Sequence, residues 1–198
     1  NVTRRQARMA IEAGATGCTQ NPAYTWKMMQ DSEERPYVME KLDNILRNEP
    51  DDNTALIKLQ RELITGVAEI FMDIYEKSHG VDGYVSIQGD PFNETAIAIE
   101  EYAIFNTALL PNMTAKVPVV EGGLAAIPKL VAAGIPVNCT EIMAVRQALD
   151  VAKIYEEVGG RMKNPAPMFY SVITGIFDEY LHKYVVEKGI DISNDVMW

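Results

Sequence analysis

The chain has 198 residues, of which 47% are hydrophobic and 23% are charged, a balance typical of a globular protein with a sizeable core. Its formal net charge of -10 repels phosphate backbones and anionic membrane surfaces, which argues against nucleic-acid or membrane partners. No apolar run reaches the roughly 18 residues of a spanning helix, and the start Asn1–Arg5 lacks the apolar core of a signal peptide. By default we expect a cytoplasmic protein.

Cysteine and histidine are both scarce. Cys18 and Cys139 fall in apolar, strand-like runs, so we expect reduced core residues rather than a disulfide or a metal-ligand pair. His79 and His182 lie among charged helical or helix-end residues, which leaves little material for a histidine metal site or a Ser-His nucleophile. The sequence therefore predicts no metal and no cofactor, and the chemistry must use other groups.

Short apolar strands alternate with longer amphipathic helices along the chain. The first part reads as a helix over 3–13, a strand over 15–19 and helices over 37–47 and 53–78. Four strand-helix units follow, with strands over 83–88, 113–119, 135–140 and 167–172 and helices over 94–109, 123–133, 141–157 and 177–188. Glycine closes three helices as expected for C-caps, at Gly134, Gly159 and Gly189. This rhythm predicts parallel strands covered by helices.

Such an α/β pattern fits either an open doubly wound sheet or a closed eight-stranded barrel. The first strand is not followed by Gly-x-Gly-x-x-Gly, so the dinucleotide-binding form of the open sheet lacks its phosphate turn. Taken singly, a polar residue at a strand end could simply hydrogen-bond a loop. Five strands carry one at the end where barrel active sites are built, however: Asn21, Gln88, Lys116, Asn138 with Thr140, and Ser171. We therefore predict a barrel whose strand ends converge in one mouth.

Lys116 is the one cation in the run Asn112–Ile127, and it lies within what otherwise reads as a buried strand. A lysine desolvated among apolar neighbours loses its charge, and the neutral amine is the form that attacks a carbonyl. The alternative is a lysine that blunts an exposed edge strand. The polar ends of the other strands favour a Schiff-base lysine.

Three segments resemble the transaldolases, class I Schiff-base enzymes that include a fructose-6-phosphate aldolase branch. Gly14–Pro22 resembles the family's Gly-x-Thr-x-x-Thr-Asn-Pro segment, Asn112–Pro118 resembles its Schiff-base strand, and Gly134–Thr140 resembles its Gly-Ile-x-x-Asn-x-Thr. The three segments stand in the family's order, and the resemblance covers nearly the whole chain. It implies a (β/α)8 TIM barrel of the transaldolase type.

The resemblance also implies roles for individual residues. Lys116 would carry the covalent imine, Asn21 and Asn138 would hold the donor's hydroxyls, Thr140 would help position a catalytic water and Ser171 would line the substrate channel. The implied reaction transfers a three-carbon dihydroxyacetone unit from a ketose or ketose phosphate to an aldehyde. It needs a small sugar or sugar phosphate as partner and no cofactor.

Two positions depart from the family pattern. Transaldolases carry a water-activating Glu where this chain has Gln88, which cannot accept a proton as a general base, and the aldolase branch resembles the chain there. Ile176 replaces the arginine that would grip the substrate phosphate. These departures favour an alternative function, an aldolase that acts on dihydroxyacetone or on substrates of the fructose 6-phosphate type.

The barrel is expected to be incomplete within this chain. By the resemblance, the family's acid/base Asp lies on a strand that would precede Asn1, and Asp191–Trp198 resembles the entry to a seventh strand. Five strands and part of another cannot close a barrel, which takes about 250 residues. We therefore expect 1–198 to be a segment of one longer barrel domain, completed by other residues or by another chain, so a homo-oligomer is one possibility. A third hypothesis is a catalytically silent barrel used for binding or assembly.

Overall fold

The computed structural model describes residues 1–191. Its five strands are β1 (Cys18–Thr19), β2 (Val85–Gln88), β3 (Met113–Pro118), β4 (Val137–Ile142) and β5 (Met168–Val172). They form one parallel sheet in the order β1-β2-β3-β4-β5, so each strand pairs with the next one in the chain. A doubly wound sheet would reverse this order, whereas a barrel grows in one direction. The sheet is therefore part of a barrel, as predicted, and its incompleteness within the described chain also agrees with the prediction.

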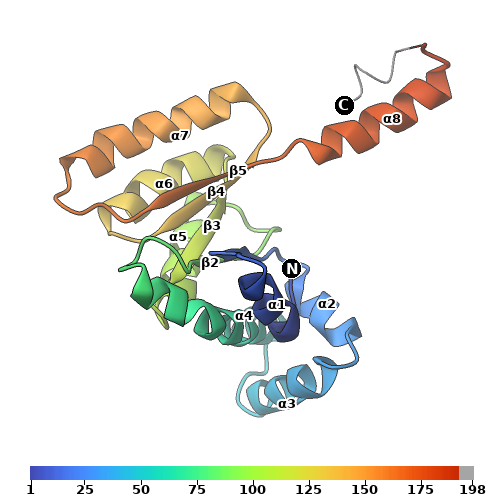
Figure 1. Ribbon diagram of the computed structural model, residues 1–198, viewed down its shortest axis with the longest axis vertical. Coiled ribbons are helices and arrows are strands. Elements are labelled where there is room, and N and C mark those ends of the chain that lie inside the picture. Colours follow the sequence, from blue (N-terminus) through green and yellow to red (C-terminus); the bar gives the residue numbers. More distant parts are fainter. Residues whose placement is uncertain (192–198) are drawn as a thin grey trace.

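The helices of the first half are α1 (Arg4–Glu12), α2 (Tyr24–Gln30), α3 (Arg35–Leu46) and α4 (Asp52–Lys77). Those of the second half are α5 (Ala96–Thr107), α6 (Glu121–Ala132), α7 (Val145–Val158), the 3-10 turn η1 (Gly159–Arg161) and α8 (Gly175–Lys188). In Figure 1, α5, α6 and α7 follow one another along one face of the curved sheet. No helix within the described chain combines the length and the apolar character that crossing a membrane requires.

Helix α4 shows how local sequence and packing agree. Asp51 caps its first turn, because the Asp51 carboxylate accepts a 2.8 Å hydrogen bond from the Thr54 amide. The buried side chains recur at helical spacing and face β2 and the neighbouring helices: Leu59, Leu63, Val67 and Phe71. The long helix is thereby fixed against the sheet.

A second apolar core lies under β3 and β4. Ala115 and Val117 of β3 join Cys139 and Ile142 of β4 in one buried cluster with α5, α6 and α7. Side chains alternate across a strand, so Thr114 and Lys116 lie on the opposite face of β3, which is the concave face of the sheet. Cys139 is a free, buried thiol, in agreement with the sequence, and Cys18 is also free.

The structure corrects three details of the predicted elements. Helix α2 was not predicted; it is short, and it buries Tyr24, Thr25 and Met28. The helix predicted from Glu141 starts at Val145 instead, because β4 runs on through Ile142. Gly159 closes α7 with an ordinary helical φ of -66°, not in a left-handed conformation.

Other predicted details are confirmed. Gly134 and Gly189 end their helices with φ of 72° and 60°, a region that favours glycine.

The predicted entry to a seventh strand, Asp191–Trp198, is not tested, because the residues after 191 lie outside the described part of the chain.

Strand β5 and helix α8 are less well covered than the rest. The β5 side chains are half-buried or exposed, and α8 buries none of its residues. Figure 1 shows α8 pointing away from the sheet and the other helices. Its exposed apolar side chains include Phe177, Leu181 and Val186.

Candidate active site

Lys116 lies on β3, the middle strand of the described sheet, with β2 on one side and β4 on the other. It is therefore not an edge lysine, and that alternative is wrong. The strand register places Gln88 of β2 directly beside Lys116, and Lys116 directly beside Asn138 of β4. Three of the predicted site residues thus stand side by side on neighbouring strands.

The Lys116 amine is partly withdrawn from water. Its Nζ donates a 3.2 Å hydrogen bond to the backbone carbonyl of Gln20, in the loop that follows β1. Burial lowers the pKa of Lys116, and the negative charge of Glu141 opposes that shift. A lowered pKa increases the fraction of neutral amine near pH 7, which is the form that attacks a carbonyl.

Gln88 is buried at the end of β2. Its side-chain Nε2 donates a 3.3 Å hydrogen bond to Oε1 of Glu141, and its backbone carbonyl accepts a 2.6 Å bond from the Gln60 side chain. A residue of β2 is thereby linked across β3 to a residue of β4.

Asn138 and Ser171 belong to a row of hydrogen bonds across the concave face. Ser171 Oγ donates to Asn138 Oδ1 at 2.9 Å, and Asn138 Nδ2 donates to Ser86 Oγ at 3.3 Å. Ser86 Oγ in turn lies 2.6 Å from the Thr19 hydroxyl. These four side chains line a hollow of about 320 Å³. The row orients the Asn138 amide next to Lys116.

Thr140 and Asn21 differ in their surroundings. Thr140 is buried on β4, two residues beyond Asn138 and therefore on the same face by strand alternation. Asn21 is exposed, and its Oδ1 accepts hydrogen bonds from the Ala23 amide, at 3.1 Å, and from the Asn1 side chain. The Asn21 side chain shapes the turn after β1. Asn21 directly follows Gln20, whose backbone carbonyl binds the Lys116 amine.

Glu141 was not predicted as a site residue, because the sequence placed it in a helix. It stands at the end of β4 with a φ of 59°, unusual for a residue other than glycine. A carboxylate directly after the polar strand end at Thr140 was the available signal. Its position depends on a backbone dihedral angle, however, which the strand pattern does not reveal.

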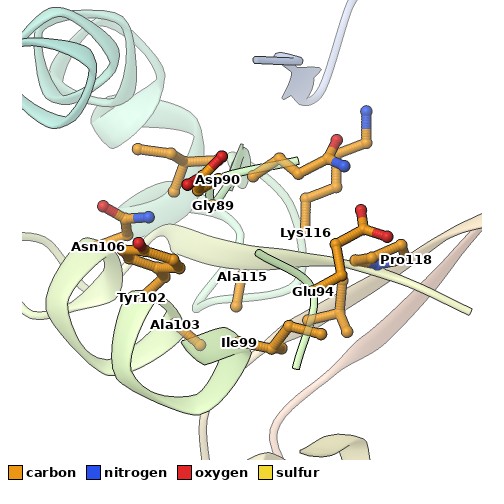
Figure 2. A pocket seen from close by; sticks show the side chains of 13 residues that line it. Gly89, Asp90, Glu94, Ile99, Tyr102, Ala103, Asn106, Ala115, Lys116 and Pro118 are labelled. Carbon is orange, nitrogen blue, oxygen red and sulfur yellow. The ribbon is translucent and has the colours of Figure 1, made fainter. Parts of the chain in front are cut away.

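Two further carboxylates lie near this end of the sheet, on Asp90 and Glu94. Figure 2 shows both at a pocket that is also lined by Lys116, Tyr102 and Asn106. The cavity measures about 20 Å³, enough for roughly one water molecule. Burial and the charges of Glu141 and Asp90 raise the pKa of Glu94. The surroundings of Lys116 are therefore acidic.

The described part of the chain offers no set of side chains that could ligate a metal ion. Among residues 1–191, no group of three or more His, Cys, Asp or Glu side chains could hold a metal ion.

Ile176 stands at the position that carries the phosphate-binding arginine in the resemblance. It lies at the start of α8 and is 55% exposed.

Comparison with known families gives the site its context. The profile of the family described as "Transaldolase/Fructose-6-phosphate aldolase" matches residues 1–191. The chain belongs to this family. Membership agrees with the resemblance of the three sequence segments and with the one-directional parallel sheet.

Several bacterial transaldolases are similar in sequence to this chain. That of Thiobacillus denitrificans is 28% identical over 152 residues, which are 75% of this chain and 42% of the relative. That of Saccharopolyspora erythraea is 29% identical over 153 residues, 75% of this chain and 40% of the relative. That of Helicobacter pylori is 35% identical over 94 residues, 46% of this chain and 29% of the relative. The matched part of the chain thus spans less than half the length of each of these relatives.

Proposed function

We propose that this protein is a Schiff-base enzyme of the transaldolase type, which transfers a three-carbon dihydroxyacetone unit from a ketose or ketose phosphate to an aldehyde. The observation that carries the proposal is Lys116, a half-buried lysine on a central strand with a lowered pKa, flanked in register by Gln88 and Asn138. Family membership supports the same reading. It also supports a place in the carbohydrate metabolism of the cytoplasm, such as the pentose phosphate pathway.

The reaction begins when the neutral Lys116 amine attacks the ketose carbonyl. The N–C bond forms and a proton passes from nitrogen to oxygen, which gives a carbinolamine. The carbinolamine hydroxyl then takes up a proton and leaves as water, while the nitrogen lone pair forms the C=N bond of an iminium ion. The iminium accepts the electrons of the bond between its α and β carbons while the β-hydroxyl loses its proton. An aldehyde leaves, and the three-carbon unit stays on Lys116 as an enamine. Addition of the enamine carbon to a second aldehyde, followed by hydrolysis, completes the transfer.

The neighbours of Lys116 are assigned to binding and positioning. Asn138, oriented by Ser171 and Ser86, holds a donor hydroxyl beside the imine, and Ser171 lines the channel. Thr140 lies on the same face and positions the water, and Gln88 takes part from the other side of Lys116. Asn21 acts as a second hydroxyl ligand if its side chain turns from Ala23 toward the mouth of the sheet.

An aldolase with an unphosphorylated donor is the second candidate. It is supported by Ile176, which offers no charge to a phosphate, and by the three carboxylates near Lys116: Asp90, Glu94 and Glu141. A carboxylate-rich rim repels a phosphate dianion and is neutral toward dihydroxyacetone. In this case a proton, not an aldehyde, captures the enamine.

Borohydride inactivation of the full-length protein tests the proposal and separates the two candidates. Borohydride reduces an imine to a stable amine, so activity or free lysine is lost only when a donor has formed the imine. We expect inactivation with fructose 6-phosphate or dihydroxyacetone, and a faster reaction with dihydroxyacetone if phosphate is not recognised. Lack of inactivation with either donor would contradict the enzyme and favour a catalytically silent barrel.

A further inference from the structure

We propose that Glu141 is the general acid and base of this site, exchanging a proton with the water that leaves and re-enters at the imine carbon on Lys116. The inference rests on the proposed Schiff-base function and adds to it a residue on β4. Three features of the structure support it: an irregularity in β4, a side chain that fixes this irregularity, and a hydrogen bond to Gln88.

The irregularity lies between Cys139 and Ile142, where the pairing of β4 with β5 shifts its register. Regular alternation would place Cys139 and Glu141 on the same face, which at Cys139 is the apolar core under the helices. Instead it is Ile142 that joins this core, and Glu141 takes a φ of 59°. The extra residue turns the carboxylate away from the apolar core and toward β2. A left-handed conformation at a residue other than glycine is a strain of the kind that clusters at functional sites.

Gln147, in the first turn of α7, fixes the backbone around this residue. Its Nε2 donates to the Glu141 carbonyl at 3.1 Å and to the Val119 carbonyl at 2.9 Å. Its Oε1 accepts from the amides of Met143 and Ala144 at 2.9 and 3.0 Å. All four hydrogen-bonding positions of the amide are used, so the end of β4 is tied to the loop after β3. The strained conformation of Glu141 is therefore held in place.

The hydrogen bond from Gln88 joins the carboxylate to the row of site residues. Gln88 stands in register with Lys116 and donates its amide to Glu141 Oε1 at 3.3 Å. A Gln side chain cannot exchange a proton in this way, whereas a carboxylate can. Asp90 is bound instead to the Phe92 amide of its own turn, at 2.8 Å. Glu141 is thus the carboxylate directly bonded to a neighbour of the reactive lysine.

The proton balance is simple. During imine formation, protonated Glu141 gives its proton to the carbinolamine hydroxyl, the C–O bond breaks, and water leaves as the nitrogen lone pair forms the C=N bond. During hydrolysis the carboxylate takes a proton from water as the water oxygen bonds to the imine carbon and the C=N electrons return to nitrogen. Gln88 acts as a positioning residue, since it orients the carboxylate without exchanging a proton.

The test compares four forms of the full-length protein: wild type, Glu141→Gln, the exchanged pair Gln88→Glu with Glu141→Gln, and Glu121→Gln. Glu121 is an exposed carboxylate at the start of α6, so its variant controls for the loss of one negative charge. Turnover of a donor and an acceptor and the rate and final extent of borohydride trapping are measured for each form. Far-ultraviolet circular dichroism reports whether each variant is folded.

We expect Glu141→Gln to lower kcat about 10²- to 10⁴-fold, with a KM change of less than about threefold. Trapping should still reach the wild-type extent, only more slowly, because Lys116 is intact. The exchanged pair keeps one carboxylate and one amide in contact and should recover kcat at least about tenfold over Glu141→Gln. Glu121→Gln should match the wild type.

A wild-type kcat in folded Glu141→Gln would overturn the inference while leaving the imine in place. Absence of any trapped adduct in the wild type would instead overturn the proposed function. If Glu141→Gln does not fold, the exchanged pair decides alone: a folded pair that traps the donor and also turns it over supports the inference, and a folded pair that traps the donor without turnover contradicts it.

Discussion

Strands β3 and β5 belong to the same parallel sheet, yet they differ in almost every physical respect. Strand β3 has a partner on each side, and its side chains are buried except at Lys116, which is half-buried. Strand β5 has one partner in the described chain, is half-exposed, and leads into α8, which buries no residue. The lowered pKa of Lys116 therefore depends on the packed strands around it. The β5 side contributes Ser171, through its hydrogen bond to Asn138.

The largest expected effect comes from removing the amine on β3. Lys116→Met should lower turnover by a factor on the order of 10⁴ to 10⁶, since loss of a covalent nucleophile removes the whole reaction path. Ser171→Ala, on β5, should cost only about tenfold, because it removes one neutral hydrogen bond to Asn138. Steady-state kinetics of both variants checks the difference. Equal losses would show that β5 is as important as β3.

The next largest effect is a difference between the packed core and α8 in how much each contributes to the stability of the fold. Phe71 on α4 is 1% exposed in the first core, so Phe71→Ala should lower the free energy of unfolding by about 3–5 kcal/mol. Leu181 on α8 is 46% exposed, so Leu181→Ala should change the free energy of unfolding by less than about 0.5 kcal/mol. Urea titrations of both variants measure the two values. A cost of several kcal/mol at Leu181 would mean that α8 is covered in solution, for example by another part of the protein or by a second copy.

Much of this contrast could be predicted from sequence, because it rests on local patterns. The alternation of side chains along β3 and the polar ends of the strands predicted that Gln88, Lys116 and Asn138 share one face. The strand register confirmed that the three residues lie side by side. The alternating strands and helices likewise predicted the parallel sheet.

What the sequence could not reveal depends on contacts between distant residues. Glu141 enters the site through one left-handed residue, and Gln147 stabilises this conformation by bonding to Val119 as well as to its own loop. Helix α2 was missed for a related reason: it has only seven residues and is held by burying Tyr24 and Met28. Neither a bulge held by tertiary hydrogen bonds nor a helix stabilised by packing has a strong periodic signal.

The pH dependence of imine formation gives a smaller, more specific effect. Burial lowers the pKa of Lys116, so the neutral amine forms at lower pH than in a free lysine side chain. The rate of borohydride trapping should rise by up to about tenfold per pH unit and level off at lower pH than trapping of N-acetyl-lysine by the same donor. Both curves are measured at saturating donor, by stopping the trapping reaction at a series of times at each pH. Coincident curves would mean that the strand does not alter the amine.

The smallest effect concerns the stability cost of the same lysine. Since its pKa is lower folded than unfolded, the native state holds fewer protons between the two pKa values, and wild-type stability rises with pH in that window. At neutral pH, Lys116→Met should therefore be more stable than the wild type and should melt at a higher temperature. The advantage should shrink as the pH approaches the unfolded pKa of about 10.4. Thermal melts at pH 7 and pH 10 provide the comparison.

The central claim is that Lys116 carries the imine, and the position of the reduced adduct tests it most directly. The full-length protein is treated with dihydroxyacetone or fructose 6-phosphate and borohydride, and its peptides are mapped by mass spectrometry. Lys129 serves as the internal control, because it is exposed on α6 and paired with Glu100 at 2.6 Å. We predict a three-carbon adduct on Lys116 that is absent from Lys129 and from the Lys116→Met variant. An adduct spread over surface lysines, or none on Lys116, would contradict the account.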